Sequence, residues 1–336
     1  MKIAILTSHL LESNKQVNIH YIYDILLRSH KVDWVTYPIS ISILRKRNRY
    51  KLNALIVGWH SQKFIFNILP KYILNSKFMR KILSFNINNP ALYKECYDVL
   101  IVEGVQPSYV YGNFKYKNLI IRMSDDLNYL DMFSDERFIF EQMTKETSQI
   151  WCVLKSTSER YRNSIYLPNP SAHSRVVDLS IRLPEVVYVG SNKINNKLLL
   201  KIANSGIKIN IYSEGCGVVH PNIILHELIP KSQLVEDIAK YKVGIIPFNT
   251  DDKNLFMEIP LKTYDYIAAG LHVVMISSSK DVKVDVINLV STHDEFLLTI
   301  KSLMKKDVDI NSYEIFLNRR SISWFKDEID TLLSKL

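Results

Sequence analysis

Short apolar runs alternate with helix-like segments along most of the chain, and this alternation restricts the fold more than any other feature. Each run is rich in aliphatic and β-branched residues and ends at a polar residue or a glycine. In the first half the predicted strands cover 2–8, 31–38, 97–104, 117–124, 150–156 and 164–171, and the predicted helices cover 19–30 and 134–149. Strands that alternate with helices predict a parallel, doubly wound sheet.

The same alternation starts again beyond a junction at 168–184. The predicted strands there cover 184–192, 207–215, 222–230, 242–248 and 271–277, and the predicted helices cover 196–206, 232–241 and 260–270. We therefore expect two Rossmann-like domains, 1–168 and 169–318, and an amphipathic helix at 319–336 that packs back toward the N-terminal domain. Ligands of open α/β sheets bind at the carboxyl ends of the strands, so two such domains facing each other would form a binding cleft.

Composition fits this organisation. The 336 residues are enough for two domains, and 47% hydrophobic with 23% charged residues is typical of a globular protein. Cys96, Cys152 and Cys216 form no C-x-x-C pair, which favours a reducing compartment over a disulfide framework or a zinc site. The sequence shows neither a signal peptide nor an apolar run of membrane-spanning length, so we expect a cytoplasmic protein.

The net charge of +9 is concentrated near the N-terminus. Residues 1–80 hold 13 Lys and Arg against three acids, and the densest run contains Arg45, Lys46, Arg47, Arg49 and Lys51. Residues 64–83 then mix apolar and aromatic side chains with spaced lysines. This pattern is compatible with an anionic membrane surface, with nucleic acid or with a solvated helix face. Of these three, we expect peripheral attachment of the protein to the inner face of the membrane, and we expect no nucleic-acid partner.

Several candidate residues lie at or just after the ends of predicted strands, where a site is expected. They are Asp125, Gly190, Glu214, Glu227 and Phe248. The first belongs to "LIIRMSDDLNYL" (119–130), in which a strand-like run ends at two adjacent carboxylates. One interpretation is a helix cap, because Ser and Asp are good N-cap residues. The other is a catalytic base at Asp125, with Asp126 as its structural neighbour.

"VVYVGSN" ends a predicted strand at Gly190 and Ser191. Small residues at such a turn let a phosphate or a ribose approach the backbone and the next helix. The chain contains neither G-x-G-x-x-G nor G-x-x-x-x-G-K-[ST], which excludes the usual dinucleotide and P-loop motifs.

The segment "EIPLKTYDYIAAGLHVV" (258–274) is more specific. Pro260 is suited to the first turn of a helix. Lys262 would then lie near the helix N-terminus, where a cation is disfavoured unless it has an anionic partner. A nucleotide diphosphate would be such a partner. The alternative is a surface ion pair between Lys262 and Asp265, worth about 0.5 kcal/mol or less.

Metal ligation is not expected. The D-x-D sequence at 307–309 does not follow a predicted strand, so we interpret it as a loop. His220, His226 and His272 lack the spacing of metal ligands.

Several blocks together resemble the GT-B glycosyltransferases, most closely the xanthan β-glucuronosyltransferase (GumK-like) family. They are "SNKQVNIHYIYDIL", "VDWVTYPISISILRKRNRY", "IRMSDDL", "YVGSN", "SEGCGVVHPNIILHELIPKSQLVEDIAKYKVGIIPF" and "PLKTYDYIAAG", and they span nearly the whole chain. The resemblance implies two Rossmann-like domains facing each other across a cleft. It also implies an inverting, metal-independent enzyme that needs no cofactor and uses a UDP-sugar as donor.

By the same resemblance, Asp125 matches the general base, Lys262 the lysine that contacts the donor, and Glu227 the glutamate that meets the nucleotide. The implied nucleotide-sugar site consists of Gly190, Ser191, Asn192, Glu227, Leu228, Phe248, Lys262, Tyr264 and Asp265. Leu228, Phe248 and Asp265 stand where the family has Met, Tyr and Gln, and Asn192 replaces another Met. The implied donor sugar is glucuronate. The implied acceptor is a hydroxyl of a lipid-linked or cell-envelope glycan in bacterial capsule or exopolysaccharide synthesis.

Two other functions stay open at this point. A nucleotide-sugar epimerase can share the two-domain fold, but it would need no sugar acceptor and would leave the basic N-terminal stretch without a role. A non-catalytic membrane-binding protein of the same fold would bind no UDP and turn nothing over.

Overall fold

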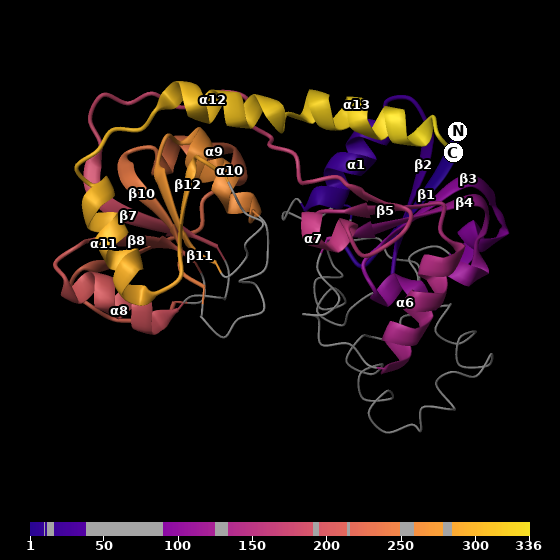
Figure 1. Ribbon diagram of the computed structural model, residues 1–336, viewed down its shortest axis with the longest axis horizontal. Helices are drawn as coiled ribbons and strands as arrows, with labels where there is room; N and C mark the ends of the chain where they lie inside the picture. Colours follow the sequence, from indigo (N-terminus) through magenta and orange to yellow (C-terminus); the bar gives the residue numbers. More distant parts are fainter. Residues whose placement is uncertain are drawn as a thin grey trace. The chain divides into compact units, whose positions relative to one another are not determined.

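The computed structural model describes residues 1–9, 11, 17–37, 90–124, 134–190, 195–213, 216–248, 259–277 and 284–336. The chain forms two compact units (Figure 1). The first unit contains Met1–Pro168 and Glu328–Leu336, and the second contains Asn169–Asp327. Each unit has its own parallel sheet with flanking helices, which confirms the predicted α/β fold class.

The first unit is built on β1 to β6. Its strands are β1 (Lys2–Thr7), β2 (Lys31–Thr36), β3 (Cys96–Glu103), β4 (Lys115–Met123), β5 (Gln149–Cys152) and β6 (Ser164–Tyr166). Its helices are α1 (Asn18–Leu27), α6 (Ser134–Glu146) and α7 (Lys155–Ser158), with 3-10 turns η2 (Pro90–Lys94), η3 (Gln106–Tyr109) and η4 (Tyr111–Asn113). Apolar residues of β1, β3 and β4 form the core, which explains their nearly continuous hydrophobic sequences.

The second unit repeats the design. Its strands are β7 (Leu183–Val189), β8 (Ile209–Tyr212), β9 (Ile223–His226), β10 (Tyr241–Ile246), β11 (His272–Ile276) and β12 (Ile287–Val290). Its helices are α8 (Asn196–Asn204), α9 (Lys231–Ile238), α10 (Leu261–Ala268), α11 (His293–Leu303) and α12 (Ile310–Arg319). Helix α13 (Ile322–Leu333) begins in this unit and ends in the first, where Gln149 Nε2 donates to the Leu332 carbonyl at 2.9 Å.

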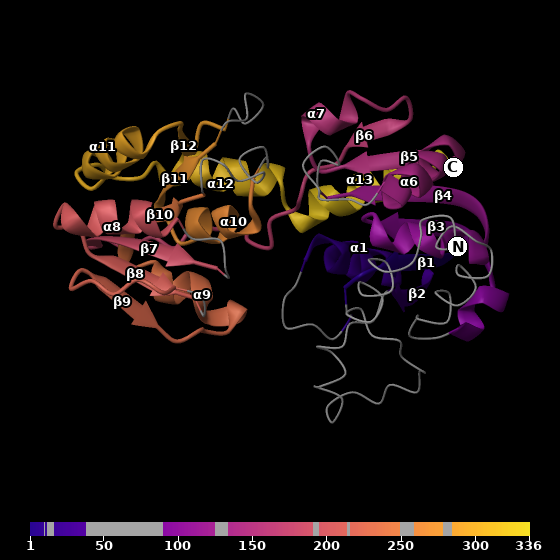
Figure 2. The ribbon, with the colours of Figure 1, turned by 90° about the horizontal axis from the view of Figure 1, so that it is seen from below.

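Helices cover both faces of the second sheet (Figure 2). Helix α8 contacts α11, whereas α10 contacts α9 and α12. The two groups lie on opposite faces because the β7–α8–β8 and β10–α10–β11 crossovers run in opposite directions across the sheet, and right-handed crossovers then place their helices on opposite sides.

Each sheet has one point at which the strand order reverses. The first sheet has the order β2-β1-β3-β4-β5-β6, so the chain leaves β1 toward β2 and then returns to the other side of β1 as β3. The second has the order β12-β11-β10-β7-β8-β9, with the reversal between β7 and β10. Connections diverge at such a point and leave a crevice at the carboxyl ends of the two strands. Each unit thus has one topological position for a ligand.

The sequence did not predict β12, α11 or α12. A signal for α11 was present, because Thr292 and Glu295 have the spacing of a capping box. In the structure Thr292 Oγ1 accepts from the Glu295 N–H at 3.2 Å, and Glu295 Oε2 accepts from the Ser291 N–H at 2.9 Å. The prediction also placed Pro260 inside α10, whereas it is the N-cap residue.

Within the described ranges, no helix has the length and apolarity needed to cross a bilayer. The basic run at 45–51 and the apolar stretch at 64–83 lie outside those ranges, so the predicted membrane-facing residues remain a prediction.

Candidate functional site

The reversal point of the second sheet places Gly190 against the side chain of Lys262. Gly190 directly follows β7 and has φ 149°, in the region that favours glycine. A Cβ atom at this position would lie 2.5 Å from Lys262 Nζ and 3.0 Å from the Tyr188 hydroxyl. A larger residue would therefore displace the amine. The glycine that the sequence singled out is favoured by its φ and leaves room for a side chain 72 positions away.

Lys262 extends from the first turn of α10 over an aromatic ring. Its Nζ lies 4.4 Å from the centre of the Tyr188 ring and donates to the Tyr188 hydroxyl at 3.2 Å. Burial lowers the pKa of Lys262 to about 8, and the nearby Asp265 carboxylate acts in the opposite direction. Burial also raises the pKa of Tyr188 to about 12. The lysine is thus a desolvated cation held by an aromatic face and a hydroxyl.

Asp265 is committed to another partner. Its Oδ1 lies 2.8 Å from His173 Nε2, and the Asp265 side chain is 12% exposed. Among the described residues no carboxylate comes within ion-pair distance of Lys262. Lys262 and Asp265 therefore do not form the surface ion pair of the alternative interpretation. Asp265 acts on the Lys262 amine electrostatically, without a direct ion pair.

The start of α10 adds to this positive environment. Its N-cap residue, Pro260, has no side-chain acceptor for the first amide groups of the helix. Helix N-termini carry a partial positive charge, and unbonded amides there can hold an anion. Lys262 is the second residue of the same helix, so the amine and the helix terminus combine at one edge of the sheet.

Two further predicted residues of this region are largely buried. Tyr264 stacks on Phe316 at 5.9 Å between ring centres and donates its hydroxyl to the Asn169 carbonyl at 2.9 Å. Phe248 follows β10 and is 7% exposed. Its carbonyl accepts from Asn195 Nδ2 at 3.5 Å, and Asn195 also caps α8. Tyr264 is thus held against α12 and Asn169, and Phe248 is held against the start of α8.

Glu227 and Leu228 follow β9, two strands away from β7, and both are exposed. The preceding residue, His226, stacks on Tyr212 at 4.5 Å between ring centres and contacts Asn210 Oδ1 through Nε2 at 2.8 Å. Since β7, β8 and β9 are parallel, these groups lie on the same carboxyl edge as Gly190. The remaining predicted donor-side residues, Ser191 and Asn192, are outside the described ranges.

On the first unit, Asp125 and Asp126 also fall outside the described residues. Ser124, which precedes them, is described, and its hydroxyl donates to Glu103 Oε1 at 3.1 Å. Glu103 ends β3 and accepts a second hydrogen bond from Thr7 at the end of β1. Sequence reasoning missed Glu103, although its place at the end of a predicted strand was a usable signal.

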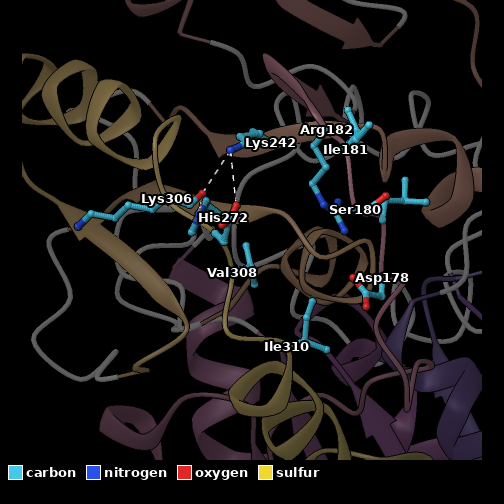
Figure 3. Close-up of a pocket in the computed structure, with 11 residues that line it drawn as sticks. Asp178, Ser180, Ile181, Arg182, Lys242, His272, Lys306, Val308 and Ile310 are labelled. Carbon is cyan, nitrogen blue, oxygen red and sulfur yellow. Dashed lines mark hydrogen bonds and ion pairs between the residues drawn. The ribbon is translucent and has the colours of Figure 1, made fainter.

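The second unit also has a cavity of about 400 Å³ at the opposite edge of its sheet (Figure 3). Lys242 and His272, from the beginning of β10 and β11, line it together with Arg182. These groups bond to the protein: Arg182 donates to three backbone carbonyls, and both Lys242 and His272 contact the Lys306 carbonyl. The cavity contains none of the predicted site residues. Since α/β sheets bind ligands at their carboxyl edge, we place the candidate site at Gly190 and Lys262.

The described residues contain no group of three or more His, Cys, Asp or Glu that could hold a metal ion.

No protein-family model and no curated protein sequence matches the chain. Solved structures share its fold. A structure from E. coli named for trehalose-6-phosphate, bound with UDP-2-fluoro glucose, has a TM-score of 0.67 at 9% identity, covering 100% of this chain and 99% of its own. A DNA-modifying β-glucosyltransferase, solved with and without uridine diphosphoglucose, has a TM-score of 0.51 at 15% identity, covering 98% and 99%.

Two more structures widen the range of activities with this fold. A UDP-N-acetylglucosamine 2-epimerase from Rickettsia bellii has a TM-score of 0.55 at 8% identity, covering 100% of this chain and 96% of the epimerase. TarM has a TM-score of 0.53 at 14% identity; the match covers 70% of this chain and 54% of TarM. At these identities the likeness establishes the fold, which is that of GT-B glycosyltransferases, and leaves the activity to the site.

The depressed pKa of Lys262 gives a stability prediction. Its value in the folded protein, about 8, is below the 10.5 of an unperturbed lysine, so folding disfavours the charged form. This penalty is fully present below about pH 8 and disappears as the pH rises toward 10.5. We expect Lys262→Met to stabilise the protein by about 2 kcal/mol near neutral pH, after allowing for partial exposure, and by less at alkaline pH.

Scanning calorimetry at two pH values measures this difference. Lys208→Met is the matched control, because the Lys208 side chain is largely exposed and lies 3.6 Å from Glu185, and it should change stability by about 0.5 kcal/mol or less. A Lys262→Met protein that melts below the wild type at neutral pH would contradict the prediction.

Proposed function

We propose that the chain is a glycosyltransferase that moves a sugar from a UDP-sugar to a hydroxyl of a lipid-linked or cell-envelope glycan. The observation that carries the proposal is the amine of Lys262. It is desolvated at the reversal point of the second sheet, beside the first turn of α10, and no described carboxylate pairs with it. A diphosphate is the anion that such a position favours, because it can accept from both the amine and the helix amides.

The proposed chemistry is an inverting displacement. The acceptor oxygen attacks the anomeric carbon, the bond from that carbon to the UDP oxygen breaks, and a base takes the hydroxyl proton. Asp125 is the base in our proposal, on the strength of its resemblance to the GumK-like family. The leaving diphosphate gains negative charge, which Lys262 and the α10 N-terminus would stabilise. The proposal includes no metal ion and no cofactor.

On the donor side we assign Glu227 and Leu228 to the nucleoside, because they are exposed on the same carboxyl edge as Gly190. Gly190 and Lys262 are assigned to the diphosphate. The proposed donor site is completed by Ser191, Asn192, Phe248, Tyr264 and Asp265. The last three are buried and contribute as supporting residues. Glucuronate remains the donor sugar that the resemblance favours.

A nucleotide-sugar epimerase is the second candidate. The observation in its favour is that a UDP-N-acetylglucosamine 2-epimerase shares the fold at a TM-score of 0.55. Such an enzyme converts a UDP-sugar in the absence of any acceptor, so product analysis with UDP-N-acetylglucosamine alone separates the two functions.

Nucleotide binding is the most direct test of the donor site. In thermal-shift assays with UDP, GDP, CMP and dTDP, followed by their sugars, we expect UDP to raise the melting temperature most. A ligand at about 100 times its Kd adds roughly 2.7 kcal/mol to stability. Since Lys262 loses its charge near pH 8, UDP affinity should fall between about pH 7 and pH 9 in the wild type and stay flat in Lys262→Met.

Glu227→Ala is expected to weaken UDP itself, and EDTA should leave the shifts unchanged. Equal UDP affinity in the wild type, Lys262→Met and Glu227→Ala would place the nucleotide elsewhere.

The base assignment predicts a contrast between two neighbours. Asp125→Asn should keep UDP binding and lose transfer by roughly 100- to 10,000-fold, because a general base is removed. Asp126→Asn is the matched control and should retain most activity. Radiolabelled transfer from the UDP-sugar found above measures both, and a dead Asp126→Asn beside an active Asp125→Asn would reverse the assignment.

Membrane attachment is the last element of the proposal, supported by the basic run of Arg45, Lys46, Arg47, Arg49 and Lys51. Each basic residue near an anionic surface contributes about 1 kcal/mol, and the apolar residues of 64–83 would add a contribution that salt does not screen. We expect co-sedimentation with anionic vesicles that high salt reduces without abolishing it.

Replacing these five residues with Ser should weaken sedimentation. The control replaces five exposed lysines of the second unit with Ser: Lys197, Lys208, Lys231, Lys240 and Lys301. Recovery of the wild type in the supernatant with every vesicle composition would remove the membrane from the proposal.

A further inference from the structure

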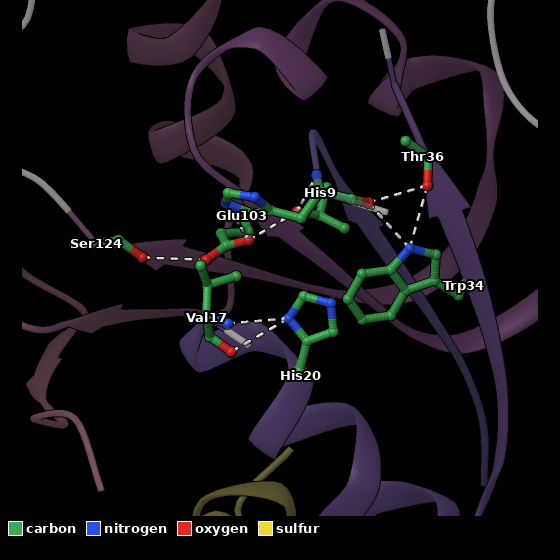
Figure 4. Close-up of polar contacts among 8 residues, drawn as sticks. His9, Val17, His20, Trp34, Thr36, Glu103 and Ser124 are labelled. Atoms are coloured by element: carbon green, nitrogen blue, oxygen red, sulfur yellow. Dashed lines mark hydrogen bonds and ion pairs between the residues drawn. The ribbon is translucent and has the colours of Figure 1, made fainter. Parts of the chain in front are cut away.

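The first unit has a polar cluster at its own reversal point, between the ends of β1 and β3 (Figure 4). We call it the Glu103 cluster; it consists of Thr7, His9, Glu103 and Ser124. Its members come from the ends of three strands and meet where the topology leaves a crevice. None of them has a role in the donor chemistry described above.

Glu103 is the fixed point of the cluster. Its residue is 5% exposed, and the two carboxylate oxygens are held separately. Thr7 Oγ1 donates to Oε2 at 2.7 Å, and Ser124 Oγ donates to Oε1 at 3.1 Å. The neighbouring strand contributes the fully buried Arg122, whose cation interacts favourably with Glu103. A buried carboxylate with two hydroxyl donors and a nearby cation is held in one orientation.

His9 is fixed through its backbone, and its ring is left accessible. The His9 carbonyl accepts from Trp34 Nε1 at 3.1 Å and from Thr36 Oγ1 at 3.0 Å. The His9 N–H donates to Thr7 Oγ1 at 3.2 Å. The side chain is nevertheless 43% exposed, in contrast to the 6% of Glu103. The imidazole therefore presents one face to solvent beside a buried carboxylate.

The spacing of the two side chains suggests what they bind. His9 Nε2 and Glu103 Oε2 are 3.9 Å apart, which is too long for a direct hydrogen bond. One oxygen atom about 2.8 Å from both of them satisfies this separation. A hydroxyl suits both partners, because it can donate to the carboxylate and accept from an imidazole that carries its proton on Nε2. An anionic group would be repelled by Glu103.

We propose that His9 and Glu103 bind a hydroxyl of a neutral saccharide, and that this saccharide is the acceptor, held by a hydroxyl other than the one that reacts. The assignment of this saccharide as the acceptor rests on the proposed function, whereas the hydroxyl site rests on the geometry of the cluster alone. His9 and Glu103 both contact the hydroxyl, and the hydrogen bond from Ser124 to Glu103 links the site to Ser124, which precedes Asp125 in the chain. The substrate class is a neutral polyol, in which a second hydroxyl is the nucleophile that Asp125 deprotonates.

Histidine-ring NMR on the full chain tests the site directly. The probes are glycerol and the methyl glycosides of glucose, galactose and mannose, with glucuronate as the charged comparison. His9 signals are assigned with His9→Gln, and His220→Gln supplies the control, because His220 is a partly exposed histidine of the second unit that contacts Asn204. We expect at least one neutral probe to shift the His9 signals, glucuronate to shift them least, and His220 to stay unchanged.

Two variants separate binding from structure. Glu103→Gln keeps the shape of the side chain and should abolish the saccharide-dependent shift at His9. The His9 side chain is partly exposed, so His9→Gln should leave the UDP-induced melting shift of the wild type intact. In transfer assays, His9→Gln should raise the acceptor KM by about tenfold with a smaller change in kcat, as expected when one hydrogen bond to a substrate hydroxyl is lost.

The outcomes distinguish this proposal from the proposed function. Saccharide shifts at His9 in a protein that binds no UDP would support the hydroxyl site and overturn the transferase. UDP binding with no shift at His9 from any neutral probe would overturn the hydroxyl site and leave the donor site standing. An unchanged acceptor KM in His9→Gln would likewise overturn it.

Discussion

The reversal of strand order in each parallel sheet is the constraint on which the rest of this structure depends. Consecutive parallel strands are joined by a crossover connection, so the carboxyl ends of all strands in the sheet lie along one edge. Where the order reverses, the two adjacent crossovers diverge and expose that edge. The chain meets this condition at β7 and β10 and again at β1 and β3. Both clusters of functional interest lie at these two positions.

At the first of these positions the protein accepts a cost in stability. Lys262 is desolvated, and its hydrogen bond to Tyr188 and its position over the Tyr188 ring offset only part of that loss. Gly190 makes room for the amine, and Asp265 is turned to His173. An internal carboxylate partner for this lysine would stabilise the folded protein and weaken the binding of an external anion. The unsatisfied charge is therefore the physical link between structure and the proposed donor binding.

In the first unit, by contrast, the buried carboxylate of Glu103 has hydrogen-bond partners within the unit. Glu103 accepts from two hydroxyl groups and interacts favourably with the cation of Arg122, whose Nη1 donates to the Leu167 carbonyl at 2.6 Å. Burial lowers the pKa of Arg122 to about 10, and Glu103 opposes that change. A carboxylate held in this way is rigid, which suits it to orient a neutral group and to exclude an anion. Lys262 thus has no described carboxylate in contact, whereas Glu103 has partners within its own unit, and this difference accords with the anionic donor and the neutral acceptor that we propose.

The sequence by itself determined most strands, most helices and the α/β class, because hydrophobic periodicity and glycine or proline boundaries act over a few residues. It also pointed to Gly190 and Lys262 through local signals. It did not reveal β12, α11 and α12, although the Thr292–Glu295 capping box was present. Only the tertiary structure decided the contacts of these groups. The Asp265–His173 pair joins residues 92 positions apart, and the Thr7–Glu103 bond joins residues 96 positions apart. Strand order sets such contacts, and no local pattern encodes strand order.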